Sequence, residues 1–374
     1  MNPFLSFLFL LASLPLLANL TPSTQTLFIG TTGRDAEGIY RVFFNEETGG
    51  FSNFALAAEI NSPGFLTLHP SEKILYAVAS WQGESGVIGY RVSENSALTE
   101  FTRMSCPDGR GCHLAVHPSG KFLLTAQYGG GSVALFPLNE TGHLNEPFIH
   151  RHQGGSGVFP KRQNAPHPHW CGYSPCGNFA LVPDLGLDQI IIYRVDPNEP
   201  KVHPHGVAHS QPGAGPRHMR FSTDEKFIFL LNELSLSVET FAWDKKNGQA
   251  LPLSLSPTLD EQEKAGETFN SAAEILTHPS GQWIYSSNRG HDTVSVLKTN
   301  QSGTTMPVLQ KHPIRGAFPR NICLSPSSKW LLAAGQDSHT ISAHQIDLQT
   351  GKLTYQRGSI TQVPSPICLL FVRR

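Results

Sequence analysis

Turns and apolar runs alternate along this chain in a pattern that occurs six times. Each copy opens with a turn containing Pro, Ser, Gly or Asp and continues into a run of aliphatic and aromatic residues. The copies are HPSEKILYAVAS (69–80), HPSGKFLLTAQY (117–128), SPCGNFALVPDL (174–185), STDEKFIFLLNE (222–233), HPSGQWIYSSNR (278–289) and SPSSKWLLAAGQ (325–336). Because a turn followed by a short apolar run is typical of a buried strand, each copy predicts one such strand.

Further strands flank each of these predicted strands. An apolar segment such as FLTLHP or HMRFST precedes each copy, and a segment such as QIIIYRVD or TVSVLKTN follows most of them. A turn with glycine, such as TGHL, NGQA or TGKL, then leads to a fourth segment. The order predicts units of about 50 residues, each with four antiparallel strands.

A seventh unit is divided between the two ends of the chain. Residues 365–372 (SPICLLFV) match the first strand of a unit, and residues 26–33 and 38–45 match the second and third. A turn, TGGFS, then leads to the fourth strand. Four-stranded units that repeat around an axis form a β-propeller. We therefore predict an all-β fold, a seven-bladed β-propeller of four-stranded antiparallel blades, closed by pairing of the N- and C-terminal strands. Another number of blades is the alternative, because the longer units could contain insertions.

The N-terminal segment differs from the remaining chain. Residues 1–18 carry no charged side chain, and their apolar run ends at the small residue Ala18. This pattern predicts a signal peptide, followed by a short linker (19–24) and a single domain (25–374). An uncleaved anchor is the alternative, because the segment lacks the usual Lys or Arg. The protein is then periplasmic or secreted, and cytoplasmic if the signal interpretation is wrong.

Composition narrows the possible partners. The 374 residues carry a net charge of −1, with 15% charged and 39% hydrophobic residues, which is typical of a globular protein. A basic surface for nucleic acid is not indicated. We expect a monomer that binds a small molecule, with no nucleic-acid partner and no stable membrane association after signal cleavage.

Six cysteines add one open question. Export would permit disulfides, and Cys106 with Cys112 and Cys171 with Cys176 stand at the ends of turns where they could pair. Free or buried thiols are the alternative. Neither spacing is that of a zinc site, and we expect no metal and no cofactor.

Comparison of the repeats separates scaffold from site. Scaffold positions should be alike in every blade, whereas site positions should differ. The position five residues before each copy holds Gly64, Cys112, His169, Arg217, Ala273 and Arg320. The last position of each copy holds Ser80, Tyr128, Leu185, Glu233, Arg289 and Gln336. These two columns vary in chemistry, while the positions between them stay apolar.

The geometry of a blade gives the columns a common location. Its first two strands are antiparallel, so the start of one and the end of the other lie on the same rim. We expect polar members of both columns around one mouth of the central channel: His169, Arg217, Glu233, Arg289 and Arg320. Neighbouring positions add His113, His218, Glu274 and Asn321. A structural role is the alternative, since a propeller channel is wet and Arg217 could simply pair with Glu233.

The residue types at this mouth suggest a reaction. Guanidinium groups bind carboxylate or phosphate, and they also stabilise a developing oxyanion. Glu233 and His169 can act as general base and acid, in either assignment. The chain has no G-x-S-x-G elbow and no H-E-x-x-H pair. Attack of water on a reactive carbonyl group, without a covalent intermediate, fits this set best.

Five motifs together resemble the seven-bladed lactonase family, and the resemblance spans nearly the whole chain. They are APHPH, PDLGLD, GPRH, NEL and SNRGHD. This family includes a bacterial type of 6-phosphogluconolactonase and the fungal carboxymuconate lactonizing enzyme. The resemblance implies hydrolysis of a sugar δ-lactone to the open acid, or the reverse ring closure.

The resemblance also implies a catalytic set. The family's His, two Arg and Glu correspond by motif to His169, Arg217, Glu233 and Arg289, with His167 as the second choice for the histidine. The stretch KRQ (161–163) resembles bacterial members. The resemblance therefore suggests substrate contacts for His167 and Arg162, with a solvated loop as the alternative for Arg162. From the columns and their neighbours we expect substrate-binding roles for His218, His113, Glu274 and Arg320 as well.

One feature departs from the family pattern. A 6-phosphogluconolactonase of central metabolism works in the cytoplasm, whereas this chain begins with an apparent export signal. An exported member would meet other lactones, including unphosphorylated ones. A lactonizing isomerase, a metal-dependent variant and a non-enzymatic binding platform are the competing hypotheses.

Overall fold

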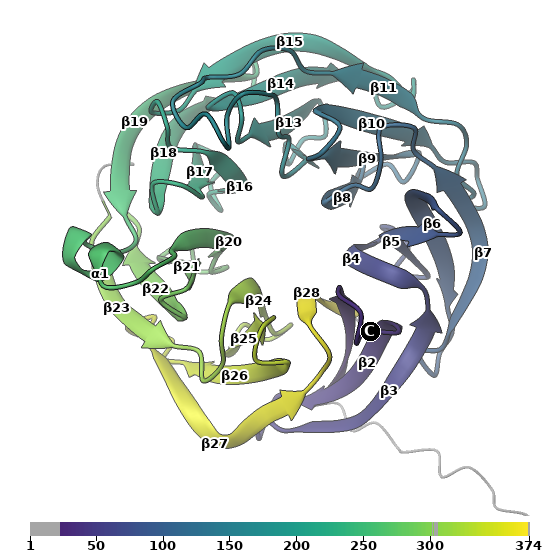
Figure 1. The fold of residues 1–374 in the computed structure, drawn as a ribbon. Coiled ribbons are helices and arrows are strands. Elements are labelled where there is room, and N and C mark those ends of the chain that lie inside the picture. Colours follow the sequence, from purple (N-terminus) through teal and green to yellow (C-terminus); the bar gives the residue numbers. More distant parts are fainter. Residues whose placement is uncertain (1–22, 301, 303–305, 373–374) are drawn as a thin grey trace, which may run out of the picture.

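The computed structural model describes residues 23–300, 302 and 306–372, and it confirms a ring of seven four-stranded antiparallel sheets (Figure 1). The predicted signal peptide, 1–18, lies outside these residues. Blade 1 is β28 (Pro366–Val372), β1 (Thr24–Thr31), β2 (Gly38–Asn45) and β3 (Phe51–Glu59). Blade 2 is β4 (Asn61–Leu68), β5 (Ile74–Trp81), β6 (Glu84–Val92) and β7 (Leu98–Ser105). Blade 3 is β8 (His113–Val116), β9 (Phe122–Gln127), β10 (Ser132–Pro137) and β11 (Phe148–Arg151).

The other four blades follow in chain order. Blade 4 is β12 (Gly172–Tyr173), β13 (Phe179–Asp184), β14 (Gln189–Val195) and β15 (Val202–His209). Blade 5 is β16 (Pro216–Phe221), β17 (Phe227–Asn232), β18 (Ser237–Asp244) and β19 (Gln249–Pro257). Blade 6 is β20 (Ser271–Thr277), β21 (Trp283–Arg289), β22 (Thr293–Lys298) and β23 (Val308–Pro313). Blade 7 is β24 (Pro319–Leu324), β25 (Trp330–Gly335), β26 (Thr340–Ile346) and β27 (Leu353–Gln362).

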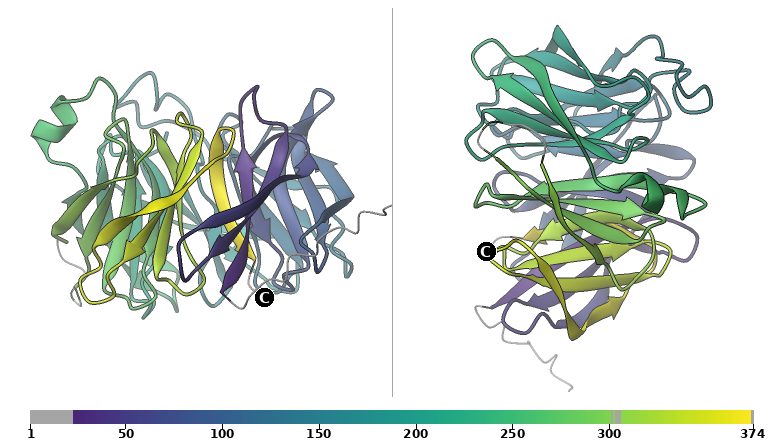
Figure 2. Two further views of the ribbon diagram at one scale, coloured as in Figure 1. Left: turned by 90° about the horizontal axis from the view of Figure 1, so that it is seen from below. Right: turned by 90° about the vertical axis from the view of Figure 1, so that its left-hand side faces the viewer.

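The ring closes as predicted, because the two ends of the chain share blade 1. Strand β28 pairs antiparallel with β1, and Phe28 lies opposite Leu370. One short helix, α1 (Glu261–Ala265), occurs in the described residues and projects beyond one face of the ring (Figure 2). It connects blade 5 to blade 6. The segment around it also supplies a residue to the mouth of the channel.

The core lies between neighbouring blades rather than inside one sheet. In β5, Leu75 and Ala77 pack toward blade 1 in a cluster with Phe28, while Ile74 and Tyr76 pack toward blade 3. Both faces of the second strand are therefore buried. This explains why each copy of the sequence pattern is a continuous apolar run instead of an alternating one.

The HPS turns lock consecutive blades together. In blade 3, Nδ1 of His117 hydrogen-bonds with Oγ of Ser119 at 2.7 Å, and Nε2 lies 3.0 Å from the carbonyl oxygen of Gly177 in blade 4. His69 and His278 make the corresponding contacts to blades 3 and 7. The histidine in HPS is thus a scaffold residue, and its recurrence does not mark a site.

Candidate active site

The first site column coincides with β-bulges in the inner strands. In blade 5, Pro216 pairs with Asn232 and His218 pairs with Leu231, so Arg217 is the extra residue. Arg320 is the extra residue in blade 7 in the same way, and a bulge also interrupts β20. A bulge bends the strand locally and re-aims a side chain. The extra residue therefore leaves the regular inward–outward alternation at one rim.

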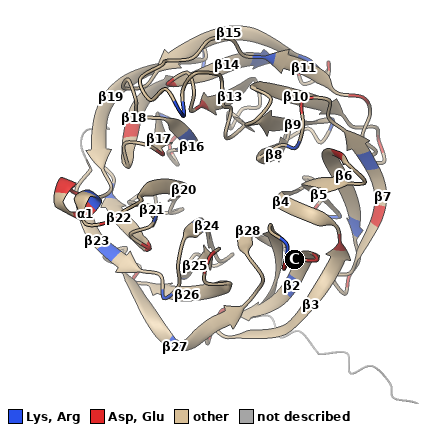
Figure 3. Cartoon of the chain, in the orientation of Figure 1, with Lys and Arg blue, Asp and Glu red and all other residues tan. Residues whose placement is uncertain are grey.

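A cavity of about 480 Å³ lies at this mouth of the channel. Its charged and histidine lining is His169, Glu233, Arg110, Arg162, Arg289 and Arg320. Tyr128 and Phe269 add aromatic surface. The inner strand β16, which faces the channel, also carries basic residues (Figure 3). The structure thus brings together members of both predicted columns, from blades 3 to 7, whereas Arg217 lines a smaller neighbouring cavity.

Glu233 is the centre of the charged cluster. Its carboxylate is buried, and Oε1 accepts a hydrogen bond of 2.7 Å from Nη2 of Arg162. The other oxygen, Oε2, lies 3.2 Å from Nη2 of Arg289 and 3.4 Å from Nε of Arg217. Three guanidinium groups from three separate parts of the chain therefore share one carboxylate.

His169 lies next to this cluster and contacts the same arginine. Nη1 of Arg217 donates to Nδ1 of His169 at 2.9 Å and also contacts Nε2. A guanidinium cannot accept, so a ring nitrogen of His169 must be unprotonated to accept its bond. The backbone N–H of His169 donates to the carbonyl oxygen of Pro183, which holds the loop against blade 4.

The surroundings set the charge states of this cluster. Burial raises the pKa of Glu233, but Arg217, Arg289 and Arg162 outweigh that effect and lower it to about 2. Burial and the charge of Arg217 hold the pKa of His169 well below its ordinary value. Burial also lowers the pKa of Arg289 to about 9, despite the opposing charge of Glu233. At neutral pH the site therefore contains a carboxylate, a neutral imidazole and protonated arginines.

Positive charge exceeds negative charge at the mouth. The cavity is lined by four arginines and a single carboxylate, Glu233. Arg320 is half-buried, and its side chain makes no hydrogen bond or ion pair with any residue that the structure describes. In the mouth of a channel, an arginine without a counter-ion favours an anionic ligand group.

Three of the predicted binding residues lie deeper in the channel. Nδ1 of His218 hydrogen-bonds to Oε1 of Glu274 at 3.0 Å, and Nη2 of Arg220 and Nδ2 of Asn321 also donate to this carboxylate. The ring of His113 lies 5.5 Å from that of His218. His113 and Glu274 do not line the mouth cavity, whereas His218 lines a smaller one of about 60 Å³ below it.

His167 and Arg162 lie beside Tyr128, a residue that the sequence analysis placed in a column but not in the site. The rings of His167 and Tyr128 stack at 4.4 Å, and Nη2 of Arg162 lies 3.2 Å from the Tyr128 hydroxyl. Arg110 and Phe269 also line the mouth without having been predicted. Column variation could have selected Tyr128, whereas Phe269 has no counterpart in the repeats.

Of the two alternatives left open for the cysteines, the structure shows free thiols at all six positions. Cys171 is fully buried and contacts the carbonyl oxygen of Leu124, while Cys176 lies exposed in the next turn. Cys106 packs in the core between blades 2 and 3, and Cys112 points to the carbonyl oxygen of His169. Each pair is thus separated by the different packing of its two members.

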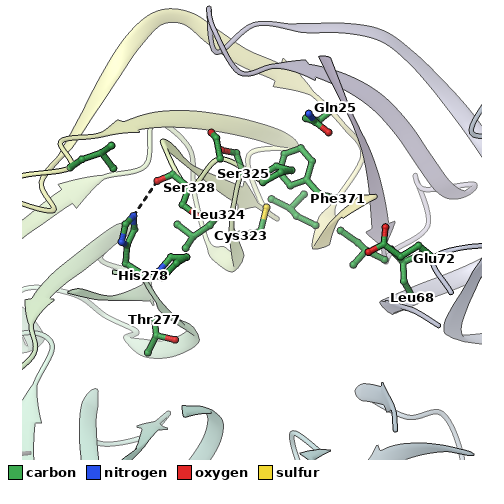
Figure 4. A pocket seen from close by; sticks show the side chains of 16 residues that line it. Gln25, Leu68, Glu72, Thr277, His278, Cys323, Leu324, Ser325, Ser328 and Phe371 are labelled. Atoms are coloured by element: carbon green, nitrogen blue, oxygen red, sulfur yellow. Dashed lines mark hydrogen bonds between the residues drawn. The ribbon is translucent and has the colours of Figure 1, made fainter. Parts of the chain in front are cut away.

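A larger cavity, about 1090 Å³, is lined by residues of the turns at the other ends of these strands, His278 and Ser325 among them (Figure 4). Glu72, His278 and Cys323 are its titratable groups, and no arginine or lysine occurs in its described lining. His278 is engaged in the inter-blade contact with Ser328. The chemistry therefore favours the smaller cavity at the mouth. In the described part of the chain, no group of three or more His, Cys, Asp or Glu is placed to hold a metal ion.

Comparison with known proteins gives a consistent result. Residues 26–371 match the family described as "Lactonase, 7-bladed beta-propeller". The 6-phosphogluconolactonase of Bacillus subtilis is 30% identical over 351 residues, covering 93% of this chain and 98% of that protein. The solved structure of a Pseudomonas aeruginosa periplasmic gluconolactonase superposes with a TM-score of 0.86 at 26% identity, covering 94% of this chain and 99% of that one. A putative 6-phosphogluconolactonase from Bacteroides fragilis gives 0.85 at 29% identity, with 94% and 99% covered.

Proposed function

The chain belongs to the seven-bladed β-propeller lactonase family, and we propose that it hydrolyses a sugar δ-lactone by direct attack of water at the mouth of the channel. The observation that carries the proposal is the buried Glu233 carboxylate with arginines on both of its oxygens. Water activation needs a deprotonated base, and the tetrahedral intermediate needs cations for its oxyanion. The mouth supplies both within one set of contacts.

Glu233 is the better candidate for the base. Its carboxylate is ionised at neutral pH, and its Oε1 partner, Arg162, has a side chain that is 36% exposed. An anionic group of the substrate competes for Arg162 and so releases Oε1 to accept a proton from water. His169, in contrast, has its acceptor ring nitrogen engaged by a hydrogen bond from Arg217. We assign His169 to the orientation of Arg217 and of the substrate.

Hydrolysis then proceeds through a tetrahedral intermediate. Water adds to the lactone carbonyl carbon while Glu233 takes one of its protons. Arg217 and Arg289 stabilise the oxyanion that forms. The ring C–O bond breaks, and the proton held by Glu233 passes to the departing ring oxygen. The products are the open hydroxy acid and a regenerated carboxylate, and the acid then loses its proton to solvent.

The excess of arginine supports a substrate that carries an anionic substituent. Arg320 is unpaired among the described residues, and Arg110 is exposed at the same mouth. A phosphorylated lactone would meet these groups, and an unphosphorylated sugar lactone would use only the carbonyl contacts.

Export is a further part of the proposal. The apolar segment 1–18 supports a periplasmic or secreted location, and a relative of similar fold is named as periplasmic. No helix in the described residues is long and apolar enough to cross a membrane. Fractionation of cells that express the full chain or a chain lacking residues 2–18 tests this part. Retention of both in the cytoplasm would contradict export.

A panel of substrates tests the proposed reaction. The purified protein is assayed with glucono-δ-lactone, its 6-phosphate and a cis,cis-muconate, each against the spontaneous rate. We expect hydrolysis of one or both sugar lactones and no ring closure of the muconate. Ring closure without hydrolysis would favour the isomerase, and saturable binding without turnover would favour a binding platform.

A further inference from the structure

Two loops that carry site arginines meet at one buried carboxylate outside the cavity. Asp188 lies in the hairpin between β13 and β14 and is 4% exposed. Arg162 lies in the long segment between β11 and β12, and Arg217 lies at the start of β16 in the next blade. Neither Asp188 nor its hairpin lines the mouth cavity.

The Asp188 carboxylate binds both loops. Oδ1 accepts a hydrogen bond of 2.7 Å from Nε2 of Gln163, the residue after Arg162. Oδ1 also accepts a bond of 2.9 Å from the N–H of Gly215, and Oδ2 accepts one of 2.7 Å from the N–H of Gly213. Gln163 is fully buried, so its amide has little freedom to choose another partner.

These bonds continue directly to the base. Gly215 adopts a φ of +69°, a left-handed conformation in which glycine is free of strain. Its carbonyl oxygen accepts a 2.7 Å hydrogen bond from the N–H of Glu233. The carboxylate of Asp188 therefore connects the side chain of Gln163, next to Arg162, to the segment before Arg217 and, through Gly215, to the backbone of Glu233.

A second hairpin carboxylate makes similar hydrogen bonds to the start of the next blade. Asp292, in the hairpin between β21 and β22, accepts a bond of 2.7 Å from the N–H of Phe318, two residues before Arg320. It also accepts a bond of 3.3 Å from the N–H of Gly290, the residue after Arg289. Twice, then, a hairpin carboxylate holds the start of the next blade's bulged, arginine-bearing strand.

We propose that Asp188 is a positioning residue for the Arg162–Glu233–Arg217 cluster: its carboxylate fixes the two loops so that both arginines reach Glu233. The inference rests on the proposed function for its kinetic part, while its structural part stands on the hydrogen bonds alone. The substitution Asp188→Asn replaces one acceptor oxygen with a donor. That donor faces at least one N–H of Gly213, Gly215 or Gln163, so a loop must shift.

The control variant is Glu239→Gln. Glu239 is also a buried carboxylate of an adjacent hairpin strand, and it binds Ser210 and Gln211, which lie on the same segment as Gly213. It also accepts a bond of 3.4 Å from Nδ2 of Asn232, the residue before Glu233, but no hydrogen bond joins it to Gly213, Gly215 or Gln163 in the described part of the chain. A merely structural role for buried carboxylates predicts equal effects of the two substitutions.

The test combines crystal structures with kinetics on the full-length protein and both variants. In Asp188→Asn we expect the 2.7 Å contact between Arg162 and Glu233 to lengthen beyond hydrogen-bond distance, and kcat/KM to fall about 10- to 100-fold. Because Glu233 loses arginine contacts in this variant, the acidic limb of the profile of kcat/KM against pH also moves to higher pH. In Glu239→Gln we expect the contact between Arg162 and Glu233 to remain and kcat/KM to stay within a few-fold of the wild-type value. The acidic limb of its pH profile should stay at the wild-type pH.

The possible results separate the positioning role of Asp188 from the proposed function. An unchanged Arg162–Glu233 contact in Asp188→Asn, or equal kinetic losses in the two variants, overturns the inference. If the wild type hydrolyses no lactone, the proposed function fails while the crystallographic contact still tests the positioning role. If Asp188→Asn does not fold, Gln163→Met decides. It removes the bond from Nε2 of Gln163 to Asp188, together with its bond to the carbonyl oxygen of Leu185 and the bond that its Oε1 accepts from the N–H of Phe159. An unchanged Arg162–Glu233 contact and an unchanged rate in this variant would overturn the inference.

Discussion

The Glu233 carboxylate of blade 5 lies 3.2 Å from the guanidinium of Arg289 in blade 6. The two residues occupy the same column of the repeat, at the end of the second strand of successive blades. Neighbouring copies of one variable position thus hold a carboxylate and a cation. Arg217, from the other column, contacts the same carboxylate and completes the cluster.

Substitution of Arg217 by lysine tests whether the guanidinium geometry matters. Lysine keeps the charge but cannot contact His169 and Glu233 with separate planar N–H groups. We expect kcat to fall roughly 100- to 1,000-fold, as for loss of one oxyanion donor. Steady-state kinetics with glucono-δ-lactone measure this, with Arg103→Lys, an exposed surface pair with Glu100, as control. Equal kcat in the two variants would count against an oxyanion role for Arg217.

Arg320 is expected to report on the substrate rather than on the chemistry. Arg320→Ala removes a cation that has no carboxylate partner in the described chain, so the fold loses no ion pair. We expect KM for a phosphorylated lactone to rise roughly 10-fold or more, with little change for the unphosphorylated one. Comparing the two substrates on this variant measures the difference. An equal change in KM for both would show that Arg320 does not bind the anionic substituent.

Acid should destabilise the protein through its buried carboxylates. Burial raises the pKa of Glu274, but His218 and Arg220 outweigh it and lower the pKa from 4.5 to about 2. The unfolded chain therefore takes up this proton at a higher pH than the folded protein does. The contribution of Glu274 to the free energy of unfolding is therefore fully present above about pH 4.5, and it is lost as the pH falls toward 2.

Buried histidines act in the same direction at higher pH. Burial lowers the pKa of His218 to about 4, although Glu274 opposes the shift. Acidification below 6.5 thus already favours the unfolded state. Urea unfolding at pH 7, 5 and 3.5 measures how the free energy of unfolding depends on pH. The Glu274→Gln variant should show a weaker dependence at the acidic end. The same dependence in that variant would show that Glu274 does not contribute.

The repeat pattern was sufficient for the fold because each blade follows the same rule. The continuous apolar run of the second strand, as in β5, reflects burial on both faces. The columns predicted that Arg217 and Glu233 would lie together, since antiparallel pairing puts strand start and strand end on the same rim. Glu233 lines the mouth cavity, and Arg217 contacts Glu233 while lining the smaller cavity below. Residues outside the repeat could not be placed this way. Phe269 comes from the segment around α1, which no other blade contains.

The depth of a side chain in the channel and its hydrogen-bond partners could not be predicted from the sequence either. His113 and Glu274 stand next to site positions in the chain, but they lie below the mouth, where Glu274 is bonded to His218. The contribution of Asp188 depends on backbone N–H groups of the next blade, which leave no pattern in the side chains. Bulges at Arg217 and Arg320 are likewise a property of strand register.

The most direct test of the account is kcat/KM for δ-lactone hydrolysis by Glu233→Gln and the wild type at pH 7, with the spontaneous rate subtracted. Glutamine keeps the shape of the side chain and a carbonyl oxygen for Arg162, but it cannot take a proton from water. We predict a fall of roughly 100- to 10,000-fold, as for loss of a general base, with the variant folded by circular dichroism. A folded Glu233→Gln protein with the wild-type kcat/KM would contradict the proposal that Glu233 activates water.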